Sequence, residues 1–167
     1  MKMMKINKYA IGAGLFLTYL LLRKTNDNET VSMRKGDYFR ATPPKTAHFT
    51  MSEFNSKDGV PVPPMYYGNI QQVMEQLEVI RRHLGSNSIT VNSGYRSPEH
   101  NEKVGGKLGS MHLKGKAVDF TVKGYTPIQV RAALRYLIEN GKILPGGIGE
   151  YNTFTHYDIG SPRTWKG

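Results

Sequence analysis

The sequence of 167 residues contains no cysteine. Disulfides and thiolate metal sites are therefore excluded, and a metal ion could be bound only through imidazole and oxygen ligands. Without cysteines, the sequence does not indicate whether the protein works in an oxidising or a reducing compartment. A chain of this length is expected to form one domain with additional segments.

Apolar runs long enough for a full membrane span are also missing. The stretch from Tyr9 to Leu22 is mostly apolar, but it is shorter than the roughly 20 residues that a spanning helix needs. It could be a signal peptide, an uncleaved signal-anchor or a buried helix. We favour the signal-anchor, because the stretch is apolar all round and charged at both ends. Residues 1–24 are thus predicted to form a transmembrane-type helix or signal peptide.

Acidic residues are scarce in the first quarter of the chain. Residues 1–45 contain 9 Lys and Arg against 3 Asp and Glu, whereas residues 46–167 contain 14 against 10. Such a basic segment suits the flank of a membrane anchor or contact with an anionic cell wall. No aromatic-basic run and no phosphate loop occurs, so we expect no nucleic-acid partner. Residues 25–45 are polar and end near Pro43-Pro44, which predicts a linker before a domain at 46–167.

Hydrophobic periodicity predicts an α+β domain. Apolar residues at helical spacing indicate helices over 70–84 and 127–140, and a shorter helix begins at Pro98. Segments near 88–93, 117–122, 148–151 and 154–159 are predicted to be strands. Residues 48–54 alternate weakly, which favours an edge strand or a docking segment.

Three polar residues have the spacing of a metal site. Asp119 shares one face of a predicted strand with the small residues Ala117 and Thr121, and His112 precedes it by seven positions. His156 lies on another alternating segment. Two imidazoles and one carboxylate leave a fourth zinc position open, as in catalytic sites. The alternative is a surface histidine beside lysines and an aspartate that braces a turn.

Two motifs carry a resemblance to a known family. The pattern S-x-H-x-x-G-x-A-x-D-F at residues 110–120 and F-x-H-x-D at residues 154–158 resemble the M15 zinc peptidases. The likeness is greatest to their phage and prophage branch, which is related to D-Ala-D-Ala carboxypeptidases, and it covers roughly residues 49–160. It implies a small antiparallel sheet flanked by helices, of the hedgehog and D-Ala-D-Ala peptidase type. It also implies Zn²⁺ bound by His112, Asp119 and His156 on the open face of that sheet.

The same resemblance suggests roles for further residues. Arg96 is expected to bind substrate or to stabilise charge during catalysis, and Ser110 either binds substrate or caps its loop. Many M15 relatives carry an acidic base three residues before the last ligand, where this chain has Thr153. Glu150, Asp158 and a route through bulk water therefore remain as alternatives for the base. For Asp158 we prefer the role of a partner to the ring N–H of a ligand.

The predicted function is that of a metallopeptidase, either a carboxypeptidase or an endopeptidase, acting on peptidoglycan stem peptides or cross-links. A phage or prophage endolysin-like origin is expected, with the domain membrane-anchored or exported and facing the periplasm and cell wall, or associated with the virion. The alternative from another class is a non-catalytic zinc-fold protein that binds the cell wall or builds the virion. The bond that is cleaved and the oligomeric state stay open.

Overall fold

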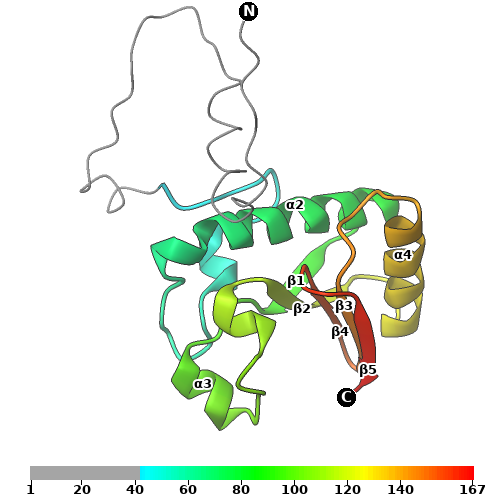
Figure 1. Cartoon of the computed structure of the whole chain (residues 1–167). Coiled ribbons are helices and arrows are strands. Elements are labelled where there is room, and N and C mark those ends of the chain that lie inside the picture. Colours follow the sequence, from blue (N-terminus) through cyan, green and yellow to red (C-terminus); the bar gives the residue numbers. More distant parts are fainter. Residues whose placement is uncertain (1–41) are drawn as a thin grey trace, which may run out of the picture. The chain divides into compact units, whose positions relative to one another are not determined.

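Five strands form one mixed sheet in the computed structural model, which describes residues 42–167 (Figure 1). The order across the sheet is β1-β2-β4-β3-β5. The strands are β1 (Ile89–Ser93), β2 (Ala117–Val122), β3 (Gly147–Glu150), β4 (Thr155–Asp158) and β5 (Arg163–Lys166).

The prediction of an α+β domain with a small sheet is confirmed, but a purely antiparallel sheet is wrong. β1, β2, β4 and β3 pair antiparallel, whereas β5 pairs parallel with β3. After β4 the chain reverses and passes to the far edge of β3, which gives β5 the direction of β3. β5 was not predicted, because this strand is short and three of its four residues are exposed.

The helices follow the predicted periodicity. They are α2 (Tyr67–His83), α3 (Pro98–Lys103) and α4 (Pro127–Glu139), with 3-10 helices η2 (Met51–Phe54), η3 (Pro64–Tyr66) and η4 (Met111–Lys114). A capping box between Thr126 and Gln129 begins α4, and Pro127 occupies its first turn. Such a box satisfies N–H groups that would otherwise lack partners at the helix start.

One face of the sheet packs into the hydrophobic core with α2 and α4. Strand residues of this face alternate with those of the other face, because successive side chains point to opposite sides. The core includes Val118 and Phe120 of β2, Ile148 of β3, Tyr157 of β4, Ile70, Met74 and Leu77 of α2, and Leu134 of α4. The opposite face of β2, β3 and β4 is therefore left for polar residues.

Residues 48–54 dock on this core without forming a strand. Met51–Phe54 is a 3-10 helix, and the buried rings of Phe49 and Phe54 meet edge to face with centroids 6.4 Å apart. The edge-strand alternative is thus replaced by the docking segment.

The predicted membrane-type helix over 1–24 and nearly all of the linker lie outside the described residues. Among the helices of residues 42–167, none is both long and apolar enough to cross a membrane.

Candidate metal centre

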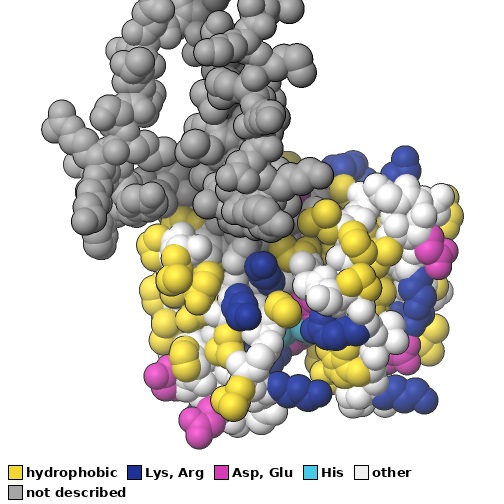
Figure 2. Space-filling model, viewed as in Figure 1, with side chains coloured by type: hydrophobic (Ala, Val, Ile, Leu, Met, Phe, Trp, Pro, Cys, Tyr) yellow, Lys and Arg dark blue, Asp and Glu magenta, His cyan; other side chains and the backbone are white. Residues whose placement is uncertain are grey.

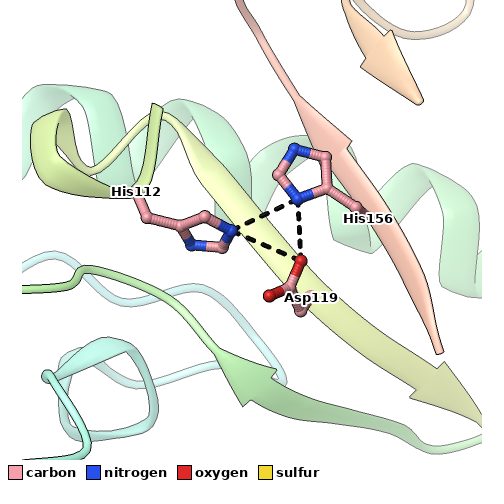
Figure 3. A group of neighbouring side chains, drawn as sticks. All are labelled: His112, Asp119 and His156. Atoms are coloured by element: carbon pink, nitrogen blue, oxygen red, sulfur yellow. Dashed lines mark hydrogen bonds and ion pairs between the residues drawn. The ribbon is translucent and has the colours of Figure 1, made fainter. Parts of the chain in front are cut away.

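The three residues predicted to be metal ligands come together from three elements (Figure 3). Asp119 on β2 lies directly opposite His156 on β4 in the antiparallel register, so both side chains are on the polar face of the sheet. His112 reaches the same point from η4. Ser110 caps the start of this helix and Gly115 caps its end, where the left-handed backbone conformation of Gly115 (φ 62°) turns the chain into β2. All three residues are buried.

Their donor atoms have the spacing of a tetrahedral zinc site. His112 Nε2 lies 3.2 Å from His156 Nδ1 and 3.3 Å from Asp119 Oδ1. The distance from His156 Nδ1 to Asp119 Oδ1 is 2.7 Å. Ligand atoms about 2.0–2.2 Å from zinc in a tetrahedron are about 3.3–3.6 Å apart. The distance of 3.3 Å fits this range, the distance of 3.2 Å lies just below it, and the distance of 2.7 Å must lengthen when zinc binds.

The hydrogen bonds behind the two histidines turn lone pairs toward the centre. His112 Nδ1 lies 2.6 Å from the carbonyl oxygen of Gly94, which can only accept a hydrogen bond. His156 Nε2 lies 3.0 Å from Asp158 Oδ2. In the neutral rings the remaining nitrogens are therefore acceptors, and they face the carboxylate oxygen of Asp119. Three acceptors that converge in this way need a cation or a proton between them.

The protonation of the cluster agrees with a cation site. Burial opposes ionisation of Asp119, but its close contacts with the rings of His112 and His156 outweigh burial and hold the pKa of Asp119 well below the usual range. Burial lowers the pKa of His112 and thus keeps its ring neutral. Burial acts in the same direction on His156, yet its bonds to Asp119 and Asp158 raise its pKa. A metal ion bound here would consequently displace a proton from His156.

Arg96 lies beside the centre and holds its carboxylate. Its Nη2 donates to Asp119 Oδ2 at 2.6 Å, and its Nε donates to Ser93 Oγ at 3.1 Å. Its backbone N–H donates to the carbonyl oxygen of His112 at 3.1 Å. The side chain is 17% exposed. Arg96 thus leaves Asp119 Oδ1 directed at the histidines, while its own side chain remains partly exposed.

The other predicted site residues occupy different positions. Ser110 Oγ accepts from the backbone N–H of His112 at 3.4 Å, as a cap does. Asp158 is fully buried behind His156 and also accepts from Arg163 and from the N–H groups of Gly147 and Gly160.

Glu150 does not reach the metal centre. It pairs with Thr155, which neighbours His156 along β4, so its side chain is on the other face of the sheet. There it forms an ion pair of 2.6 Å with Arg135 of α4. The structure therefore removes Glu150 as a candidate base, because the alternation of β3 directs it away.

Two residues near the centre were missed from the sequence. Arg163 binds Asp158, and the Trp165 ring packs edge to face on His156 with centroids 4.9 Å apart. Both lie on β5, the unpredicted strand. The sequence did offer one signal for them: Arg163 and Trp165 are two residues apart, as are His156 and Asp158, which they contact.

Comparison with known proteins places these residues in a family. The model of the family described as Peptidase M15 matches residues 45–158. A probable peptidoglycan L,D-endopeptidase MepK of Haemophilus influenzae is 40% identical over 86 residues, which cover 47% of this chain and 43% of the relative. The zinc D-Ala-D-Ala carboxypeptidase of Streptomyces albus G is 33% identical over 100 residues, or 59% of this chain and 38% of the relative.

The similarity therefore spans about two fifths of each of these two relatives. The family match over residues 45–158 includes His112, Asp119 and His156. Because the family model extends over more than half of the sequence, the chain belongs to the peptidase M15 family.

Proposed function

We propose that this chain is a zinc-dependent peptidase that hydrolyses peptide bonds in the stem peptides or cross-links of peptidoglycan. One observation carries the proposal: His112 Nε2, His156 Nδ1 and Asp119 Oδ1 converge as three buried acceptors with near-tetrahedral spacing. Two imidazoles and a carboxylate are a zinc ligand set with an open position. The family and the name of the Streptomyces relative support zinc as the metal.

The bound metal would supply a water of lowered pKa and polarise the scissile carbonyl. Residues of the chain would prepare the site for that chemistry. Asp158 holds the Nε2–H of His156, and the carbonyl of Gly94 holds the Nδ1–H of His112, so both rings are fixed before substrate arrives. Arg96 would bind a substrate carboxylate or the oxygen that gains negative charge, with the part of its guanidinium not used by Asp119.

Peptidoglycan as the substrate is supported by both relatives and by charge. The Haemophilus protein is named as a peptidoglycan endopeptidase, and the Streptomyces protein as a D-Ala-D-Ala carboxypeptidase. Arg96 and Arg163 form ion pairs with Asp119 and Asp158 at the candidate centre, and further Lys and Arg side chains lie on the face seen in Figure 2. Positive charge around a catalytic centre would attract stem peptides, which carry carboxylates.

We further propose that the peptidase domain works outside the inner membrane, held there or exported by residues 1–24, and that it derives from a phage or prophage. The basic and apolar composition of the N-terminus supports the first point. The resemblance of the two motifs to the phage branch supports the second.

A second candidate is a wall-binding protein that keeps the zinc fold without turnover. Two observations favour it: Thr153 stands where many relatives have the base, and Glu150 is paired with Arg135 on the other face. Asp158, the remaining acid, is fully buried and bonded to four groups. Proton transfer would then depend on solvent.

Digestion of purified peptidoglycan distinguishes the two candidates. The zinc-loaded chain is incubated with peptidoglycan, with and without a chelator, and released fragments are identified by mass. The peptidase predicts release that the chelator stops and zinc restores, and the masses identify the bond. Binding to peptidoglycan without release, from a folded and zinc-loaded chain, would favour the wall-binding protein.

A further inference from the structure

β5 lies beyond residue 158, where the match to the family model ends, yet its side chains reach the metal centre. β3 lies between β5 and β4 in the sheet. Gly147 of β3 is opposite Asp158 on one side and Arg163 on the other, and Gly149 is opposite both His156 and Trp165. Arg163 and Trp165 are therefore on the same face as Asp158 and His156, with matching spacing.

The two glycines of β3 allow this contact across the strand. A Cβ added to Gly149 would lie 2.9 Å from His156 Cβ and 2.9 Å from Trp165 Cζ2. A Cβ added to Gly147 would lie 2.6 Å from Arg163 Nη1 and would also strike Asp158. A side chain at either position would therefore displace the side chains of β5 from those of β4. Because Gly147 and Gly149 have no side chains, the side chains of β5 can contact those of β4.

Arg163 fixes the carboxylate behind His156. Its Nη2 donates to Asp158 Oδ2 at 2.6 Å, and its Nη1 donates to Oδ1 at 3.1 Å, as a two-pronged fork. Asp158 Oδ2 is also the oxygen that faces His156 Nε2. A fork of this kind restricts a carboxylate in both position and orientation. Rotation of the Asp158 carboxylate, and with it of the His156 ring, is therefore restrained by Arg163.

Trp165 fixes the same imidazole from its side. Its ring meets the His156 ring at 64° with centroids 4.9 Å apart. The indole is held in turn by Arg163, whose Cζ lies 4.9 Å from the ring centroid. It also donates from Nε1 to the Tyr151 hydroxyl at 3.3 Å. The two β5 side chains thus support each other as well as His156.

We propose that Arg163 and Trp165 are positioning residues of the metal centre, which orient His156 so that its Nδ1 faces the metal ion. Arg163 acts through Asp158, and Trp165 acts by direct packing. This inference rests on the proposed metal centre. It extends the functional unit from residue 158 to the end of β5.

The test measures zinc affinity by chelator competition in the full chain and in the variants Arg163→Met and Trp165→Leu. Loss of partners that orient a ligand typically weakens metal affinity about 10- to 100-fold, and we expect each variant to fall in this range. The visible spectrum of the cobalt(II)-loaded protein should change as well, since it reports ligand geometry at the metal. A purely structural role of β5 would lower the melting temperature and leave this spectrum unchanged.

Conservative variants and a charge control complete the test. Trp165→Phe should retain most of the affinity, and Arg163→Lys should recover part of it. Because these two changes are mild, they also serve if the larger ones fail to fold. Lys166→Gln removes a positive charge from an exposed position of the same strand and should bind zinc as the unaltered chain does.

Zinc affinities within about twofold of the unaltered chain, with unchanged cobalt spectra, would overturn the role of β5. Equal weakening by Lys166→Gln would also overturn it, because charge alone would then explain the effect. Failure of the unaltered chain to bind zinc would instead overturn the metal centre itself, and this inference with it.

Discussion

At the scale of single residues, the metal centre is built in pairs of a ligand and the group behind it. Gly94 O lies behind His112, Asp158 behind His156, and Arg96 behind Asp119. Each pair sets which atom of the ligand faces the centre. That the three candidate ligands lie together could be predicted from the sequence, because side-chain type and strand alternation both mark them. The carbonyl of Gly94 could not, because a backbone oxygen has no signature in sequence.

The ligands themselves give the first prediction. Replacement of His156 or Asp119 by alanine removes one of three donors and should weaken zinc binding by more than the roughly 100-fold that loss of an outer partner costs. Chelator competition measures this. His83→Ala is the matched control, since His83 is exposed and stacks on Tyr136. Retention of tight zinc binding by both ligand variants would place the metal elsewhere.

Arg96 gives a second prediction at this scale. Arg96→Lys keeps the positive charge but loses the planar fork. If Arg96 stabilises charge on the substrate, kcat/KM for a synthetic stem peptide should fall about 100-fold, as for loss of an oxyanion donor. Zinc affinity should fall much less. If kcat/KM and zinc affinity fell by the same factor, Arg96 would act only by holding Asp119.

At the scale of elements, the helices were predictable and the edge strand was not. α2 and α4 each bury one apolar face, and Thr126-Pro127 marks the start of α4, so local sequence is sufficient. β5 has only one partly buried residue among four, and its position depends on the bare glycines of β3. The side chains of β5 contact β4 across Gly147 and Gly149. Such a contact between separate strands produces no periodic pattern in the local sequence.

The attachment of residues 46–48 to α2 gives a prediction about pH. Glu78 accepts from Thr46 Oγ1 at 2.7 Å and from the His48 N–H at 2.9 Å. Burial opposes its ionisation, but these bonds lower its pKa below the ordinary value. A carboxylate with a depressed pKa stabilises the fold above its unfolded pKa, about 4.3 for glutamate, and this stabilisation is lost as the pH falls through the folded value.

Glu78→Gln should therefore reduce the free energy of unfolding at pH 6. The difference in this free energy between the variant and the unaltered chain should become smaller as the pH falls below about 4.3. Denaturant titrations at several pH values measure it. Glu75→Gln, at an exposed position on the same helix, is the control. A difference that stayed constant down to pH 2.5 would contradict the assignment to the Glu78 carboxylate.

At the scale of the whole molecule, a metal ion at the proposed centre would join parts of the chain that are far apart in sequence. His112, Asp119 and His156 come from η4, β2 and β4, so a bound ion crosslinks the loop region to two strands. Zinc that binds only the folded state adds stability, about 2.7 kcal/mol at a free concentration of 100 times Kd. The melting temperature should thus rise with zinc, fall with chelator, and stay constant in His156→Ala.

A crystal structure of the zinc-loaded chain, with anomalous data at the zinc edge, would locate the metal ion itself. We expect one strong peak at the centre of the polar face, within about 2.0–2.2 Å of His112 Nε2, His156 Nδ1 and Asp119 Oδ1. A peak bound by other residues, or no peak in a zinc-soaked crystal, would contradict it.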